Sequence, residues 1–365
     1  MQNTIRKNPA RGAVAQGTPS RKKQHVELTL TRDVSFRTKT TGLEELEFIN
    51  NALPELNLSE IDTSTEFLGR TLALPVMVSC MTGGYADALQ INRQLAEVCE
   101  EVGIAMGVGS QRQAMEDTTY HKTFSIVREV APSIPIVGNI GAAEVAQMNG
   151  VDSIRRLVDL IRADAFTVHL NPLQEFLQPE GNTNFRGVLS GIATLVEQLP
   201  IPVIIKEIGA GISTEVARRL LDVGVRHIDV AGAGGTSWAG VETLRRRDGG
   251  FAEQFWDWGI PTAIAIREVA ALKSSANNFV LIASGGITTG FEAAKCIALG
   301  ADLVASARPV LSALHRGKKK GVRALLDSWA QVLRGIMFLT GSGTLTALQH
   351  APLVRYRSHH ESSAV

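Results

Sequence analysis

The sequence is poor in cysteine, in net charge and in long apolar runs, and each shortage removes a class of function. Its 365 residues include three cysteines, Cys80, Cys99 and Cys296, and no C-x-x-C pair. Neither a disulfide framework nor a zinc site is indicated, and a reducing cytoplasmic location is expected. The formal net charge of +1 gives no global attraction to nucleic acid or to a membrane surface. No apolar run approaches the roughly 18 residues that span a bilayer.

The first 20 residues lack hydrophobic periodicity and are rich in Gly, Ala, Asn, Gln and Arg. They contain basic groups but no apolar core, so they do not resemble a secretory signal. We predict a disordered tail over residues 1–20 and a single domain over residues 21–365.

From residue 75 onward, eight short apolar runs alternate with stretches of helical periodicity. The runs are P-V-M-V-S, I-A-M-G-V-G-S, P-I-V-G-N, A-F-T-V-H-L, P-V-I-I-K-E, H-I-D-V-A-G, V-L-I-A-S-G-G and D-L-V-A-S-A-R. Near-continuous apolar runs indicate strands that are buried on both faces of a parallel sheet. Residues 88–102 and 289–299 illustrate the helices between them, and Gly103 and Gly300 follow these two segments. The alternation predicts a (β/α)8 TIM barrel, with a doubly wound sheet as the alternative.

A ninth apolar run, I-P-T-A-I-A-I, begins at Ile260. Eight strands already complete a barrel, so we interpret this run as part of an insertion after the sixth strand.

Every predicted strand ends in polar or glycine residues, and in a barrel the chemistry lies at these carboxyl ends. These ends carry Met81 to Gly84, Ser110 to Arg112, Asn139, His169 with Asn171, Lys206 with Glu207, Thr236, Ser284 to Gly286, and Ala307 with Arg308. One or two capped ends could be structural, whereas eight favour a functional site.

The glycine-rich stretch S-G-G-I-T-T-G, residues 284–290, follows the seventh strand and opens a helix. Backbone N–H groups there can bind a phosphate, helped by the helix dipole. Arg308 follows the eighth strand, and these two loops are the usual phosphate site of this fold. A plain tight turn is the alternative.

The remaining strand ends suit a flavin ring. Lys206 can face the electron-rich N1–C2=O edge of a reduced flavin, Asn139 and Thr82 can bond ring heteroatoms, and Gly83 permits close backbone approach. The alternative is a buried Lys206 paired with a carboxylate such as Glu207 or Asp229.

Seven motifs occur in the order found in type 2 isopentenyl-diphosphate isomerases, which the chain resembles over residues 21–355. They are R-K-K-Q-H, M-T-G-G, G-S-Q-R, H-L-N-P-L-Q-E, K-E-I-G-A-G, G-G-T-S-W and A-S-G-G-I, from residues 21, 81, 109, 169, 206, 234 and 283. The first and the fourth motif are the most specific, because many flavin barrels share the glycine-rich ones.

The resemblance implies an FMN-dependent TIM barrel that interconverts isopentenyl and dimethylallyl diphosphates. It implies reduced FMN, Mg²⁺, NADPH as the reductant, and a homo-oligomer, either a tetramer or an octamer. By resemblance, FMN would contact Ser79, Cys80, Met81, Thr82, Ser110, Asn139, Lys206, Thr236, Gly285, Gly286, Ile287, Thr288, Ala307 and Arg308. The substrate would contact Arg21, Lys22, His25, Ser110, Gln111, Arg112, Asn171 and Gln174, so an N-terminal segment would close over the barrel.

Within the H-L-N-P-L-Q-E motif, the resemblance assigns Gln174 to the reacting carbons and Glu175 to Mg²⁺. A diphosphate needs a hard cation with oxygen ligands, and Mg²⁺ typically uses one carboxylate plus phosphate oxygens. His169 and Lys206 are the other catalytic candidates; a satisfied histidine at a strand end is the alternative for His169. An amide is a poor acid and Glu175 would be occupied by the metal, so N5 of the reduced flavin is the better acid–base candidate.

The sequence differs from the family pattern in three places, and three alternative functions were weighed. Cys80 stands where the family has Ala, Gly or Ser, Thr288 stands where members often have Arg, and the N-terminal segment is longer than usual. A 2-hydroxy-acid oxidase would need a late His-Gly-Gly-Arg motif, and an IMP-dehydrogenase-like enzyme would need a nucleophilic cysteine in a mid-barrel loop; neither is found. The third rival is a non-catalytic flavin-binding protein, which retention of Gln174 and Glu175 disfavours.

Overall fold

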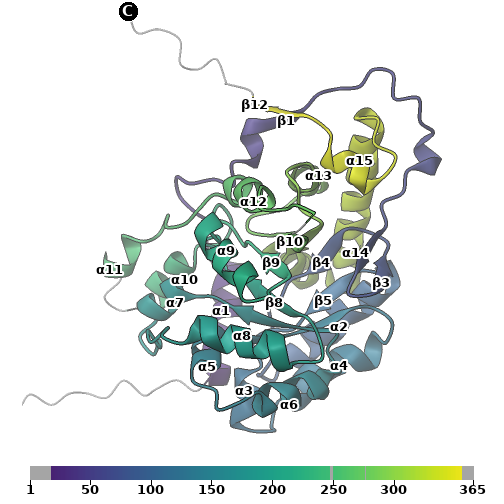
Figure 1. The fold of residues 1–365 in the computed structure, drawn as a ribbon. Helices are drawn as coiled ribbons and strands as arrows, with labels where there is room; N and C mark the ends of the chain where they lie inside the picture. Colours follow the sequence, from purple (N-terminus) through teal and green to yellow (C-terminus); the bar gives the residue numbers. More distant parts are fainter. Residues whose placement is uncertain (1–17, 247–249, 276, 356–365) are drawn as a thin grey trace, which may run out of the picture.

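The computed structural model describes residues 18–246, 250–275 and 277–355, and at its centre lies a closed barrel of eight parallel strands (Figure 1). The strands are β4 (Val76–Val78), β5 (Ala105–Gly107), β6 (Ile136–Gly141), β7 (Ala165–His169), β8 (Val203–Lys206), β9 (His227–Asp229), β10 (Val280–Ala283) and β11 (Leu303–Ser306). Each corresponds to one of the eight apolar runs, so the predicted barrel is confirmed. β11 pairs with β4, and this closure excludes a doubly wound sheet.

Helices surround the barrel in the order that the periodicity predicts. They are α2 (Ala88–Val102), α3 (Arg112–Glu116), α4 (His121–Val130), α5 (Ala142–Ala146), α6 (Asp152–Ile161), α7 (Pro172–Leu177), α8 (Val188–Gln198), α9 (Thr214–Asp222), α10 (Trp238–Arg245), α11 (Gly250–Glu253), α12 (Thr262–Ala270), α13 (Gly290–Ala298), α14 (Arg308–Leu339) and α15 (Leu345–Gln349). In α2 the residues Leu95, Val98 and Cys99 are buried, and Gly103 ends the helix with a positive φ of 77°. The ninth apolar run forms α12, so it is not a barrel strand.

The barrel interior is a packed core that is plugged at its amino-terminal end. Side chains from alternate strand positions, including Met77, Val137 and Ile204, form one apolar cluster. The hairpin of β2 (Thr65–Phe67) and β3 (Arg70–Leu72) adds Phe67 and Leu72 to the same cluster. The amino-terminal end is therefore closed, which leaves the carboxyl end of the strands for a ligand.

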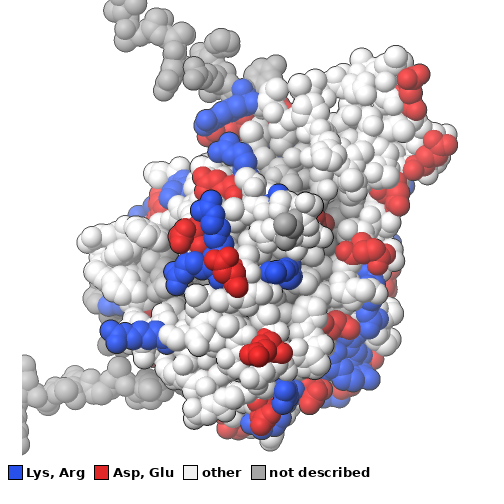
Figure 2. Space-filling model, viewed as in Figure 1, with Lys and Arg blue, Asp and Glu red and all other residues white. Residues whose placement is uncertain are grey.

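The remaining elements pack outside the barrel. The short helices η1 (Leu43–Glu45) and η2 (Leu58–Glu60) precede the hairpin, and β1 (Leu46–Phe48) pairs antiparallel with β12 (Leu353–Arg355). Residue Lys318, with φ 52° and ψ −148°, divides α14 into two helical pieces. On the face shown in Figure 2, cationic and anionic side chains are interspersed.

The first described element is α1 (Thr18–Thr31). Residues 18–20, which we predicted to be disordered, belong to this helix; the rest of the predicted tail lies outside the described residues. A helix is possible here because residues 18–31 contain no glycine and their single proline, Pro19, stands in the first turn. None of the helices in the described part of the chain has the length and apolarity to cross a bilayer.

Candidate active site

The predicted polar residues gather at one end of the barrel because all eight strands run in the same direction. Helix α1 crosses this end. Lys22 contacts the loops that follow β4 and β5, whereas His25 contacts α10, which follows β9. Residues that lie far from the barrel in sequence therefore cover its mouth.

The side chain of Lys22 extends from α1 into the barrel mouth. It donates hydrogen bonds to the carbonyl oxygens of Gly83 (2.9 Å) and Ser110 (2.5 Å), and its Nζ lies 5.3 Å from the centre of the Phe124 ring. Burial, reinforced by the charge of Arg21, lowers the pKa of Lys22 to about 7. Among the described residues, no carboxylate lies within ion-pair distance of this amine, so an anion bound beside it would favour its charged form.

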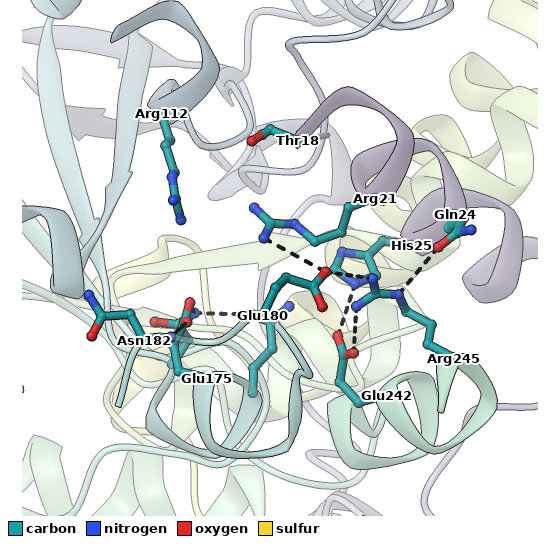
Figure 3. Close-up of polar contacts among 12 residues, drawn as sticks. Thr18, Arg21, Gln24, His25, Arg112, Glu175, Glu180, Asn182, Glu242 and Arg245 are labelled. Carbon is teal, nitrogen blue, oxygen red and sulfur yellow. Dashed lines mark hydrogen bonds and ion pairs between the residues drawn. The ribbon is translucent and has the colours of Figure 1, made fainter. Parts of the chain in front are cut away.

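Arg21 and His25 join a network of charges between α1, α10 and the segment after α7 (Figure 3). Arg21 lies 3.9 Å from Glu180, and His25 lies 2.9 Å from Glu242. Arg245 bridges the two carboxylates, at 2.7 Å from Glu180 and 2.6 Å from Glu242. Glu180, Glu242 and Arg245 were missed in the sequence; the spacing of Glu242 and Arg245, three residues apart on a helix, was the available signal.

Three consecutive residues after β5, Ser110, Gln111 and Arg112, contact different parts of the structure. Arg112 pairs with Glu144 at 3.0 Å and with Glu116 at 3.3 Å. Gln111 is fully buried, and its amide bonds the carbonyl of Leu157 and the backbone N–H of Asn139. Both amide atoms are thus bonded inside the fold and support the strand ends, while the substrate contact expected for Gln111 stays a prediction.

His169 and Asn139 meet across neighbouring strands. Nδ1 of His169 lies 3.0 Å from Oδ1 of Asn139, so Nδ1 carries the proton and donates it. Burial first, and then the nearby charge of Lys206, lower the pKa of His169 to about 3. The imidazole is therefore neutral at physiological pH, where it can orient a neighbour or accept a hydrogen bond at Nε2 but cannot act as a cationic acid.

Asn171, Gln174 and Glu175 form one hydrogen-bonded group at the start of α7. Nδ2 of Asn171 donates to Oε1 of Gln174 (3.1 Å) and to Oε1 of Glu175 (2.9 Å). Oε2 of Glu175 accepts from the backbone N–H of Asn182 at 2.6 Å. Oδ1 of Asn171 is buried without a partner in the described structure. A buried acceptor of this kind is costly unless a ligand or water satisfies it.

Glu175 suits a magnesium ion that the substrate helps to hold. Across the described residues, no cluster of three or more His, Cys, Asp or Glu side chains is arranged for a metal. Mg²⁺ commonly takes only one or two carboxylates and completes its shell with phosphate oxygens and water. The carboxylate of Glu175, fixed by Asn171 and by the N–H of Asn182, fits this role.

Lys206 is buried at the end of β8, and neither alternative carboxylate pairs with it within the described structure. Its Nζ donates to the backbone carbonyl of Glu207 at 2.5 Å. The carboxylate of Glu207 instead accepts the N–H groups of Ile208 and Gly209, at 2.6 Å each. Burial raises the pKa of Asp229 and of Glu207, and Lys206 opposes both shifts. A buried cation without a paired anion favours a ligand that carries negative charge.

The segment after β4 is buried and internally bonded. Ser79 donates its N–H to the carbonyl of Ser306 at 2.9 Å, and the hydroxyl of Thr82 bonds Asn92. Burial raises the pKa of Cys80 to about 11, so it is a thiol, as expected for a small packing residue. Met81 is half-buried.

The glycine loop after β10 is the part of the site that fits an FMN phosphate. Gly285 and Gly286 have positive φ values of 99° and 73°, which side chains rarely adopt. In the described structure, no group accepts a hydrogen bond from the N–H of Gly286 or of Ile287. Ala307 begins α14 without a side-chain cap. These free donors beside a helix start match the chemistry of a phosphate site.

Two predicted FMN contacts have partners of their own. Thr288 bonds Glu292 through both its N–H (2.7 Å) and its hydroxyl (2.8 Å). Thr236 forms an antiparallel bridge with Ser35. The side chain of Arg308 bonds the N-terminal segment, which is taken up below.

A cleft beside Gln174 provides an apolar surface at the mouth. Its lining includes Phe36, Leu173, Trp238 and Trp258. Trp238 is held by a hydrogen bond of 3.0 Å to the carbonyl of Ile208. The site therefore combines cationic groups, one fixed carboxylate and an apolar wall.

Comparison with known proteins supports a flavin site. The model of the FMN-dependent dehydrogenase family matches residues 15–130 and 167–355. Relatives named isopentenyl-diphosphate delta-isomerase come from Pelodictyon phaeoclathratiforme, Chlorobium luteolum and Methanothermobacter thermautotrophicus, at 46, 48 and 46% identity. Each alignment covers 92% of this chain, and respectively 97, 96 and 92% of the relative.

Solved structures are similar in fold. A mandelate oxidase with benzaldehyde has a TM-score of 0.63 at 20% identity, over 91% of this chain and 94% of the other. A putative lactate oxidase from Pediococcus acidilactici has a TM-score of 0.67 at 18% identity, over 93% and 94%. At this identity the likeness concerns the fold alone.

Proposed function

This chain belongs to the FMN-dependent dehydrogenase family, alongside relatives named isopentenyl-diphosphate delta-isomerase, and we propose that it interconverts isopentenyl and dimethylallyl diphosphates. One observation carries the proposal: the cations of α1 and the group of Asn171, Gln174 and Glu175 meet at the same barrel mouth. A diphosphate requires both parts, because its negative charge must be neutralised and a hard cation must be held.

The diphosphate would bind between α1 and the loop after β5. Arg21, Lys22 and Arg112 would supply the positive charge, and Glu175 would hold Mg²⁺, which would supply further positive charge. Arg112 is paired with Glu144, so it would exchange one anion for another as the substrate enters. The five-carbon alkene would lie beside Gln174.

The isomerisation adds a proton at C4 of the alkene and removes one from C2, with no net transfer of electrons. When bound, reduced FMN would supply the acid–base group at N5. Lys206, buried at the end of β8, would favour the anionic edge of the ring. His169, neutral and bonded to Asn139, would hold that amide toward the ring. Gln174, bonded to Asn171, would position the alkene beside the cofactor.

The phosphate of FMN would be held at the loop after β10 by the free N–H groups of Gly286 and Ile287, with the start of α14 beside it. NADPH as the reductant, a cytoplasmic location and a homo-oligomeric state complete the proposal.

The deciding experiment is an anaerobic assay with isopentenyl diphosphate, FMN, NADPH and Mg²⁺ in D₂O. We expect dimethylallyl diphosphate with deuterium in the methyl group that derives from C4, and no turnover when either FMN or Mg²⁺ is left out. A 2-hydroxy acid offered with oxidised FMN serves as the comparison for oxidase chemistry. Oxidation of that acid without isomerisation would overturn the proposal, and so would a failure to bind FMN.

A further inference from the structure

Arg308 stands at the start of α14, yet its side chain is committed to the N-terminal segment. Nε donates to the carbonyl of Thr29 at 3.0 Å, Nη1 to the hydroxyl of Ser35 at 3.0 Å, and Nη2 to the carbonyl of Arg32 at 3.4 Å. All three nitrogens of the guanidinium group therefore contact one stretch of chain, the end of α1 and the residues just after it.

Helix α1 is held by polar contacts of this kind rather than by burial in the core. None of its residues is buried in the core, and its last turn contains no basic residue. The final carbonyl groups of a helix lack internal partners and carry partial negative charge. Arg308 supplies, from a distant part of the sequence, the cation and the donors that this helix end lacks.

The chain that follows α1 leads directly to the glycine loops. We call residues 32–41 the strap. The carbonyl of Val34 accepts from the N–H of Ser237 at 2.7 Å, and the N–H of Phe36 donates to the carbonyl of Gly235 at 3.3 Å. A Cβ atom at Gly286 would lie 2.5 Å from the methyl group of Thr41. The strap thus lies against the loops that carry the free N–H groups.

The backbone of residue 308, unlike its side chain, lies at the loop after the eighth strand of the barrel. It begins α14, where Ala307 offers no side-chain cap. The usual phosphate site of this fold includes the loop after the eighth strand. The backbone of Arg308 therefore lies at the expected phosphate position, and its side chain contacts α1, the helix expected to bind the substrate.

We propose that Arg308 is a positioning residue that holds α1 over the barrel mouth. Through it, binding of phosphate at the FMN site would favour the position in which α1 covers the substrate; we call α1 in this role the clamp. The inference rests on the proposed function. It differs from the role expected by resemblance, in which Arg308 contacts FMN. A phosphate at the start of α14 would order the backbone of residue 308, and the guanidinium group would transmit that order to the end of α1.

The test uses the full chain with Arg308→Gln, Arg308→Lys and the matched control Arg323→Gln. Arg323 lies on α14 and pairs with Asp327 at 2.8 Å. Two measurements are made on each protein: the affinity for FMN by fluorescence quenching, and the rate of tryptic cleavage after residues 21–23 by mass spectrometry. Cleavage at other sites and the melting temperature control for general loss of stability.

In the wild type, FMN should slow cleavage after residues 21–23. Arg308→Gln should retain FMN affinity within roughly threefold and raise this cleavage by at least roughly tenfold, since the loss of a single charge-assisted contact already corresponds to about that factor. FMN should no longer slow the cleavage. The KM for isopentenyl diphosphate should rise by a similar factor while kcat changes less. Arg308→Lys should restore part of the protection because it keeps the charge, and Arg323→Gln should match the wild type.

Cleavage after residues 21–23 that is unchanged in Arg308→Gln would overturn the inference, most plainly if FMN affinity fell at least tenfold, as for a direct phosphate ligand. Cleavage that rises equally at all sites would also overturn it. Failure of the wild type to bind FMN would refute the proposed function and the coupling, whereas cleavage of the ligand-free proteins would still decide whether Arg308 holds α1.

Discussion

Replacement of Glu175 by glutamine tests the metal site with the smallest change of shape. The carboxylate accepts one hydrogen bond from Asn171 at 2.9 Å and one from the N–H of Asn182 at 2.6 Å. Glutamine can retain one of these bonds through its carbonyl oxygen, but its NH₂ group cannot accept the other. The variant should therefore fold and lose roughly 1–3 kcal/mol of stability from one unmet bond.

The effect on magnesium should be much larger than the effect on stability. Loss of a residue that merely orients a metal ligand typically weakens binding by 10–100-fold. Asn171 is such a residue here, so Asn171→Ala should fall within about that range. Glu175→Gln removes the ligand charge itself, so we expect the Mg²⁺ concentration for half-maximal activity to rise by more than about a hundredfold. Turnover should fall by orders of magnitude, whereas FMN affinity should stay within a factor of about two.

The assay is a magnesium titration of isomerase activity at saturating reduced FMN, with FMN affinity measured separately. Glu197→Gln, an exposed position on α8, is the matched control and should behave as the wild type. An unaltered magnesium requirement in Glu175→Gln would show that the metal is held elsewhere, and the reasoning from the Asn171 group would fail.

Three further predictions concern α1 and the protein's pH dependence. Arg21→Ala should raise the KM for the diphosphate by roughly ten- to a hundredfold, as loss of a charge-assisted phosphate contact does; steady-state kinetics with wild-type KM and kcat would contradict the clamp. Because burial lowers the pKa of Lys22 to about 7, substrate affinity should fall as pH rises through that value, and Lys22→Arg should flatten the profile; an equally steep profile in this variant would assign the titration to another group. Burial lowers the pKa of His227 from 6.5 to about 4, so the folded protein favours the neutral imidazole. The contribution of His227 to the free energy of unfolding should be fully present above pH 6.5. It should fall by up to roughly 3 kcal/mol as the pH approaches 4. Denaturant titrations should show a weaker acid loss in His227→Phe, and an identical loss would place the responsible group elsewhere.

The barrel strands could be predicted because each is a short apolar run that is buried on both faces. Such a run is visible in the residues themselves, and so is the alternation with helices that requires a parallel sheet. The ninth run was set aside only because eight strands already complete a barrel, and its residues did not show that positions 262–270 would be a helix.

The beginning of α1 shows where local reasoning fails. Residues 18–31 have no apolar face that would bury in a core, and none of them is buried as a whole residue, although the amine of Lys22 is inserted between loops. The helix is held by contacts from other parts of the chain: Lys22 to the loops after β4 and β5, His25 to Glu242, and Arg308 to its last turn. Disorder was therefore the natural prediction for its first residues.

The sequence by itself determined which residues stand at the strand ends, because the order of strands and polar residues along the chain is local information. Parallel strands then bring those residues to one mouth. Only the tertiary structure decided how each side chain is used, because the contacts depend on burial and on how distant segments pack together. The amide of Gln111 bonds backbone groups inside the fold, and Lys206 bonds a carbonyl oxygen. Arg308 contacts residues more than 270 positions away. Such pairings depend on distances and burial that arise when the chain has closed into a barrel.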